Sequence, residues 1–145
     1  MTEHPSEYTD FVESFMAMNP DSLITRMNIE ILEVRPERVV GTMPVEGNTQ
    51  PYGLLHGGAS AVLAETLGSF GAALHAGPNR VAVGLDLNAT HHRAARSGVV
   101  TGVATPLSLG STLASYEIVV TDDHDHRICT ARLTCLLRDA PPARR

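Results

Sequence analysis

The segment Gly57–Ala76, GGASAVLAETLGSFGAALHA, constrains the fold of this chain more than any other part of the sequence. Its length and its alanine content predict one long helix. Because the segment is apolar almost all the way round, we expect the helix to be enclosed by the rest of the fold. The helix is predicted to end at Gly77-Pro78-Asn79, whose residues favour turns.

The segments around this helix have the β-branched residues and the alternation that are typical of strands. Six segments are predicted to be strands: 27–34, 38–45, 80–90, 98–107, 112–121 and 127–137. Connections of a few residues between them imply antiparallel neighbours. A short helix is predicted at 8–18. We therefore expect an α+β domain in which one antiparallel sheet of five or six strands wraps around the long helix.

The length of 145 residues predicts a single domain that can bury a sizeable core without a metal or a disulfide. We assign this domain to residues 8–138 and expect flexible termini at 1–7 and 139–145, the latter with two prolines and no apolar periodicity. The first residues lack the basic start and the apolar centre of a signal peptide, so we expect a cytoplasmic protein.

Charge and cysteine content exclude several classes of protein. A formal net charge of −5 argues against a general nucleic-acid-binding protein. All eleven basic residues are arginine, which excludes lysine-based Schiff-base chemistry. Cys129 and Cys135 would lie roughly 20 Å apart on one strand, which is too far for a disulfide. The histidine pairs lack matching ligands at useful spacing, so no metal site is predicted.

Two features of the long helix suggest chemistry. Glu65 lies among apolar residues, where a carboxylate is costly unless it is paired or useful. A structural ion pair with an arginine is the alternative to a catalytic role. His56-Gly57-Gly58 opens the helix, where unpaired N–H groups and the helix dipole favour negative charge. The Gly57 N–H would make an oxyanion site, unless the glycines only form a tight turn.

The spacing of these two features predicts an oligomer. Gly57 and Glu65 are eight residues apart, which is about 12 Å along a helix axis. A substrate carbonyl cannot place its oxygen on the Gly57 N–H and its carbon near the Glu65 carboxylate of the same helix. If both groups act on one carbonyl, they come from two chains. We therefore predict a homodimer with two equivalent composite sites.

Three further candidates surround these groups. The Gln50 amide could orient a water or a substrate carbonyl, or could be a solvated loop residue. Ser69 lies one turn beyond Glu65 on the same helical face, where it could hydrogen-bond the acid or simply allow close packing. The segment 88–96, NATHHRAAR, suits either phosphate contacts or a solvated turn.

Three stretches, QPYGLLHGGASAVLAETLGSFGA, LNATHHRAARSG and LGSTLASYEIVVTDDHDHRICTARLT, together resemble a known family. It is the hotdog-fold thioesterases of the phenylacetate-pathway and 4-hydroxybenzoyl-CoA thioesterase group. The resemblance spans roughly residues 25–138. It is greatest to the bacterial branch that hydrolyses 1,4-dihydroxy-2-naphthoyl-CoA in menaquinone synthesis, or clears misloaded aryl carriers in siderophore synthesis. It implies a hotdog fold and a thioester hydrolase.

The resemblance also implies roles for the candidate residues. Glu65 matches the catalytic carboxylate, as nucleophile or as general base toward water, and the Gly57 N–H matches the group that polarises the thioester carbonyl. Gln50 and His56 match residues that position carbonyl and water, and Ser69 matches a hydroxyl near the acid. The positions implied to contact the CoA arm or the acyl group are Gly84, His91, His92, Arg93, Ser108, Gly110 and Ser111.

One departure from the family concerns the carrier. In several relatives the turn near Ser111 holds a basic residue, whereas this chain has Gly-Ser-Thr-Leu at 110–113. The departure implies that the nucleotide phosphates are held less firmly, or that Arg93 and Arg96 hold them instead. A further alternative is that the acyl group is carried by a protein-bound pantetheine rather than by CoA.

The remaining expectations concern activity and assembly. A thioester needs no metal or triad, so no cofactor is expected beyond the CoA of the substrate, and there is no G-x-S-x-G elbow. The resemblance implies an aryl or fused-ring acyl group, with a medium-chain acyl group as the alternative. It also implies that dimers pair into a tetramer, with the dimer alone as the alternative, and no membrane or nucleic-acid partner is expected. The alternatives are an acyl-CoA-sensing module without turnover and a hotdog dehydratase, whose His–acid motif is not apparent.

Overall fold

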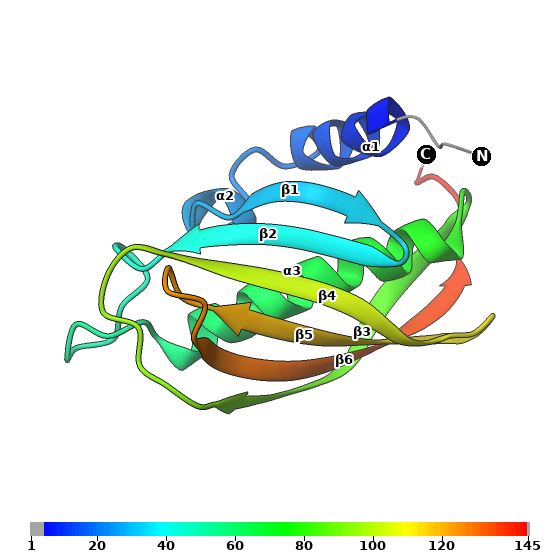
Figure 1. Ribbon diagram of the computed structural model, residues 1–145. Coiled ribbons are helices and arrows are strands. Elements are labelled where there is room, and N and C mark those ends of the chain that lie inside the picture. The colour runs from blue at the N-terminus through cyan, green and yellow to red at the C-terminus, as the bar shows by residue number, and fades with distance from the viewer. Residues whose placement is uncertain (1–4, 145) are drawn as a thin grey trace.

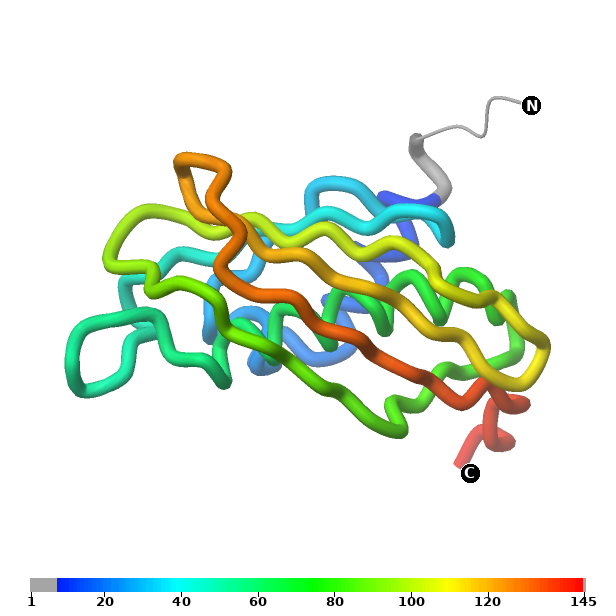
Figure 2. The backbone as a smooth tube through the Cα atoms, turned by 60° about the horizontal axis from the view of Figure 1, so that its bottom comes forward, coloured from blue at the N-terminus to red at the C-terminus, as the bar shows by residue number. Residues whose placement is uncertain are grey.

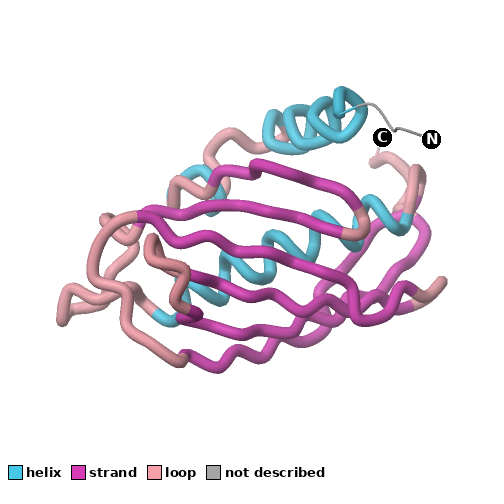
Figure 3. The backbone as a smooth tube through the Cα atoms, viewed as in Figure 1, coloured by secondary structure: helices cyan, strands magenta, loops and turns pink. Residues whose placement is uncertain are grey.

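Residues 5–144 are described by the computed structural model, and they form three helices and one sheet of six strands (Figure 1). The helices are α1 (Pro5–Ala17), α2 (Leu23–Arg26) and α3 (Gly57–Ala76). The strands are β1 (Glu30–Arg35), β2 (Arg38–Pro44), β3 (Arg80–His91), β4 (Val99–Leu109), β5 (Leu113–Thr121) and β6 (Arg127–Asp139). The sheet curves around α3, as Figure 3 shows with strands in magenta and helices in cyan.

The sheet has the strand order β1-β2-β4-β5-β6-β3, and each neighbouring pair is antiparallel. The chain therefore leaves the β1–β2 hairpin, passes through α3 and adds β3 at the opposite edge (Figure 2). The predicted α+β architecture is confirmed, as are the ends of α3. Strand β3 is an edge strand, one side of which pairs with no other strand of the described residues, and its Val83 and Leu85 are 39% and 55% exposed.

A few boundaries differ from the sequence prediction. Helix α2 was not predicted, because its four residues are too few to reveal a helical period. Helix α1 begins at Pro5, so residues 5–7 belong to a helix rather than to the expected flexible N-terminus, while residues 1–4 and 145 lie outside the described residues. Strand β6 continues to Asp139, which pairs with Arg80 of β3.

Two glycines allow α3 to lie close to the sheet. A Cβ on Gly68 would lie 2.7 Å from Leu133 Cδ2, and a Cβ on Gly71 would lie 2.7 Å from the Tyr116 ring carbon Cζ. Both distances are shorter than a carbon–carbon contact, so only glycine fits at these points. Tyr116 is fully buried and donates its hydroxyl to the Pro36 carbonyl at 2.5 Å, which ties β5 to the β1–β2 turn. Burial, with the charge of Glu37 second, raises the Tyr116 pKa.

The expectation that α3 is enclosed on every side is wrong for one face. Its sheet-facing residues are buried, including Leu63, Ala64, Leu67 and Gly68. Glu65 lies beside edge strand β3, and its side chain is exposed. The apolar composition of the helix did not reveal this, because small alanines and glycines occur on both faces.

Both cysteines lie on β6 with their thiols free and buried, so the predicted absence of a disulfide between them is confirmed. Burial raises the pKa of each thiol. Within the described residues, no helix combines the length and the apolar character that crossing a membrane would require.

Candidate functional site

The start of α3 leaves one backbone N–H available. His56 is the N-cap, and its Nδ1 accepts the Gly58 N–H at 2.8 Å. The His56 carbonyl accepts the Ala59 and Ser60 N–H groups at 2.9 and 3.3 Å. The Gly57 N–H has no acceptor among residues 5–144. Since it also carries the positive end of the helix dipole, it can polarise a carbonyl oxygen that approaches it.

The imidazole of His91 lies directly over Gly57. A Cβ on Gly57 would lie 2.8 Å from His91 Nε2, so a larger residue would displace the ring. His91 ends β3 and pairs with Cys129 of β6, which fixes its backbone beside the helix start. Because Gly57 has no side chain, the His91 imidazole can lie next to the unpaired N–H. His91 was among the residues predicted to contact the substrate.

Gln50 lies in the loop before α3 and makes hydrogen bonds within it. Its side-chain Oε1 accepts the Tyr52 N–H at 2.5 Å, and its backbone N–H donates to the Leu54 carbonyl at 2.8 Å. The carbonyl half of the amide therefore shapes the loop, while the Nε2 half has no acceptor among the described residues. A substrate oxygen is the partner that this remaining donor can take.

Glu65 lies in the middle of α3 against strand β3. Its Oε1 is 2.7 Å from the position that a Cβ on Gly84 would occupy, so Gly84 makes the space in which the carboxylate lies. A β-bulge follows directly, between Gly84 and Asp86. The alternative interpretation of Glu65 required an arginine partner, and none forms an ion pair with it within residues 5–144.

Ser69 follows Glu65 by one helical turn and lies beside Cys135, the residue that pairs with Gly84. Burial raises the pKa of the Cys135 thiol, the Ser69 hydroxyl opposes that shift, and the charge of Glu65 adds to it. These three causes place Glu65, Ser69 and Cys135 within one small neighbourhood. A buried thiol with a raised pKa is a poor nucleophile, so Cys135 is not suited to act as one.

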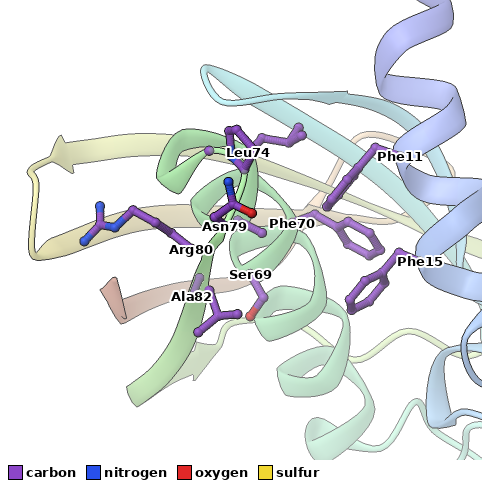
Figure 4. Close-up of a pocket in the computed structure, with 12 residues that line it drawn as sticks. Phe11, Phe15, Ser69, Phe70, Leu74, Asn79, Arg80 and Ala82 are labelled. Carbon is purple, nitrogen blue, oxygen red and sulfur yellow. The ribbon is translucent and has the colours of Figure 1, made fainter. Parts of the chain in front are cut away.

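A groove of about 590 Å³ continues from Ser69 along the second half of α3. It runs between α1 and the start of β3, and Figure 4 shows Phe11, Phe15 and Phe70 along one side of it. Sequence reasoning did not include these aromatic residues in the site. The spacing of Phe11 and Phe15 on one helical face was visible, but it indicated only that α1 packs on something.

Apart from Gly84, which lies beside Glu65, the predicted substrate-binding residues fall into two separate groups. His91 ends β3, and His92 and Arg93 follow it near the start of α3. His92 Nε2 and Thr130 Oγ1 are 2.9 Å apart. Arg93 is exposed and has no ion-pair partner among the described residues.

The second group, Ser108, Gly110 and Ser111, lies in and around the β4–β5 turn at the opposite end of α3. There the Gly110 carbonyl lies 2.7 Å from His75 Nε2, and Arg80 donates to the Ser111 carbonyl at 3.0 Å. A helix of 20 residues is about 30 Å long. One chain therefore does not bring this group together with Gly57.

Comparison with known proteins points in one direction. Residues 52–129 match the model of the thioesterase superfamily. The proofreading thioesterase EntH of Cronobacter turicensis is 43% identical over 124 residues, which cover 85% of this chain and 90% of that protein. A crystal structure of a thioesterase from Haemophilus influenzae has a TM-score of 0.82 and 37% identity, covering 88% of this chain and 90% of the other.

A protein from Staphylococcus aureus adds information about the site. The crystal structure of its variant with alanine in place of a glutamate at position 47 has a TM-score of 0.79 and 31% identity, covering 82% of this chain and 100% of the other. Its variant with alanine in place of a glutamine at position 32 has a TM-score of 0.77 and 32% identity, covering 80% and 98%. The substituted positions are 15 residues apart, the same spacing as Gln50 and Glu65.

Proposed function

Because this chain belongs to the thioesterase superfamily, we propose that it hydrolyses an acyl-CoA thioester, with Glu65 as the catalytic carboxylate and the Gly57 N–H as the oxyanion donor. The hotdog fold and the activity of a thioester hydrolase belong to the family as a whole. The observation that carries the assignment of Glu65 is its position against Gly84 without an ion-pair partner in the described residues.

The reaction needs only these parts. The Glu65 carboxylate attacks the thioester carbonyl, or takes a proton from the water that does so. Negative charge then develops on the carbonyl oxygen, where an N–H donor lowers the barrier. The C–S bond breaks, CoA leaves as a thiol, and one water is consumed for each free acid formed. No metal or serine nucleophile is required, because the thioester is already activated.

Gln50 is assigned to the same reaction as a donor to the substrate. The spacing of 15 residues between the glutamine and the glutamate substituted in the Staphylococcus aureus protein supports this pairing. The Gln50 Nε2 is the available half of the amide, so we expect it to donate to the thioester carbonyl or to the attacking water. His56, whose Nδ1 is engaged by Gly58, contributes through its Nε2.

The site is composite in this proposal. Glu65 and Gly57 are about 12 Å apart along one helix, so the donor for a carbonyl near Glu65 comes from a second copy. Edge strand β3 supports such a dimer, because its unpaired side and its exposed Val83 and Leu85 can be covered by the same strand of a partner. Two dimers are further proposed to pair into a tetramer, which light scattering after size-exclusion chromatography tests.

Replacing the carboxylate tests the assignment of Glu65. Glu65→Gln is expected to lower kcat by about a thousandfold, in the range of general-base catalysis. The side chain is exposed, so the melting temperature is expected to stay unchanged. Glu46→Gln, an exposed loop carboxylate, is the matched control. Release of CoA thiol is the readout, and hydrolysis retained within about tenfold of wild type would remove Glu65 from the mechanism.

Mixing two inactive chains tests the composite site. Glu65→Gln and Gly57→Ala are each expected to be nearly inactive as homodimers. When they are co-expressed with separate tags, half of the dimers are mixed, and each mixed dimer holds one intact site. Activity is then expected to recover to about a quarter of wild type, as two-fold symmetry requires. Sites contained within single chains would give no recovery.

The acyl group is proposed to be an aryl or fused-ring acid, such as 1,4-dihydroxy-2-naphthoate. A panel of benzoyl-, 1,4-dihydroxy-2-naphthoyl-, phenylacetyl- and hexanoyl-CoA measures this preference through kcat/KM. A second candidate is an aryl thioester on a carrier protein, which the similarity to a proofreading thioesterase favours. Benzoyl-phosphopantetheine on a carrier domain therefore belongs in the same panel, and a higher kcat/KM on that substrate than on benzoyl-CoA would select this candidate.

A further inference from the structure

We propose that the groove between α1 and the second half of α3 receives the distal end of the acyl group, and that Phe11 and Phe15 of α1 select an aromatic one. This inference rests on the proposed function. It assigns to helix α1 a role in selecting the acyl group. It concerns residues before position 52, where the match to the family model begins.

The groove is continuous with the catalytic residues. Ser69 lines it and lies one turn from Glu65 on the same face of α3. Ala82 also lines it, two residues before the Gly84 that makes room for the carboxylate. In Figure 4 the Ser69 and Ala82 side chains lie together, and the phenylalanines extend along one side. An acyl group whose carbonyl is held at Glu65 therefore points into this space.

The lining of the groove suits a neutral, apolar group. Apart from Ser69, its polar lining residues are Asn79 and Arg80, beside the start of β3. The Arg80 guanidinium is already engaged, because it donates to the carbonyls of Ser111 and Leu137 at 3.0 and 3.2 Å and lies 3.6 Å from the Asp139 carboxylate. No other cationic side chain lines the groove among residues 5–144. A charged acyl tail would lose its hydration there without gaining a partner.

Three aromatic rings make the groove selective for a ring. Phe15 and Phe70 meet edge to face at 5.3 Å between centroids, and Phe11 and Phe70 do so at 6.2 Å. Phe15 remains 47% exposed although it lines the groove, so part of its ring has no contact with residues 5–144. A further ring can make the same type of contact with this open surface, which aliphatic chains do not match. The volume of about 590 Å³ lies within the range of small-molecule sites.

Binding of inert analogues tests this role separately from turnover. S-phenacyl-CoA and S-acetonyl-CoA are thioethers that keep a carbonyl and differ only in a phenyl or methyl end. Calorimetry on the wild-type protein is expected to give a phenacyl affinity at least about tenfold higher. Phe15→Leu and Phe11→Leu keep an apolar side chain but remove the ring. Each is expected to reduce this advantage about three- to tenfold and to leave the acetonyl affinity unchanged.

Met18→Ala is the matched control, because Met18 directly follows α1, is 80% exposed and does not line the groove. An equal phenacyl advantage in wild type, Phe15→Leu and Phe11→Leu would overturn the inference. So would a change of oligomeric state with an unchanged advantage, since the groove would then be covered by a second copy. The proposed function fails separately: in that case the wild type binds the analogues but releases no thiol from benzoyl-CoA.

Discussion

The two ends of α3 contain similar residues but differ in which of their polar groups are hydrogen-bonded within the fold. At the start, His56 caps the helix and leaves the Gly57 N–H without an acceptor among residues 5–144, with His91 above it. At the other end, His75 and Arg80 are hydrogen-bonded to backbone carbonyls of the β4–β5 turn. The polar groups at the first end remain available for a ligand, whereas those at the second end are used within the fold.

The family resemblance implied substrate contacts at both ends of α3, and the hydrogen bonds of the two ends differ. Histidine, glycine, serine and arginine near turns occur at each end, and their types do not reveal which hydrogen bonds are already made. We therefore expect substitutions at the first end to change kcat, and substitutions at the second end to change stability and KM. The predictions below test this contrast, beginning with the largest expected effect.

Among the substitutions that compare the two ends of α3, Gly57→Ala is expected to have the largest effect on turnover. Its Cβ would overlap His91 Nε2 at 2.8 Å and obstruct the approach to the N–H. Loss of an oxyanion donor costs a factor of about 100 or more in kcat. Thermal unfolding is expected to change little, because the exposed His91 ring can rotate away. Steady-state thiol release measures kcat, and a value within threefold of wild type would contradict the role of this end.

Gly110→Ala is the corresponding substitution at the other end. Its Cβ would lie 2.9 Å from the Leu113 carbonyl oxygen, a backbone atom that cannot move without opening the β4–β5 turn. We expect a loss of about 1–3 kcal/mol in the free energy of unfolding, measured by urea denaturation. The kcat should remain within about twofold of wild type, and a collapse of kcat without loss of stability would reverse the contrast between the two ends.

Two substitutions of His56 distinguish its role as helix cap from its role in catalysis at the first end of α3. His56→Ala removes the acceptor of the Gly58 N–H and is expected to cost about 1 kcal/mol of stability. His56→Asn supplies another good cap, so it should restore most of that stability. Because asparagine lacks the imidazole Nε2, kcat is expected to stay low in both variants. If His56→Asn restored kcat, His56 would contribute to turnover only as the cap of α3.

His75→Ala is expected to have the smallest effect. It removes one hydrogen bond to the Gly110 carbonyl and should cost about 0.5–1.5 kcal/mol of stability. The β4–β5 turn loses one of the two side-chain hydrogen bonds that hold it, so KM for a CoA thioester is expected to rise while kcat stays the same. An unchanged KM, with the loss of stability observed, would remove this turn from the CoA-binding surface.

Much of the fold was predictable because its signals are local. The apolar segment 57–76, its terminating Gly77-Pro78-Asn79 and the turns between strands appear directly in the sequence, and the structure confirms each of them. The site was predictable in part for the same reason, since His56-Gly57-Gly58 marks a helix start. The groove was not, because Phe11 and Phe15 contact Phe70 across more than 50 residues of chain.

The sequence by itself determined the long helix and the antiparallel strands around it. It also determined that Gly57 and Glu65 lie about 12 Å apart along the helix axis, because each residue of a helix adds about 1.5 Å of rise whatever surrounds it. Only the tertiary structure decided which face of α3 the sheet covers, and therefore that Glu65 is exposed beside Gly84. It also decided which polar groups are already paired, since His75 and Arg80 meet their carbonyl partners only when α3 and the β4–β5 turn pack together. Hydrogen bonds between distant segments depend on how the segments pack, so the composition and the spacing of residues do not reveal them.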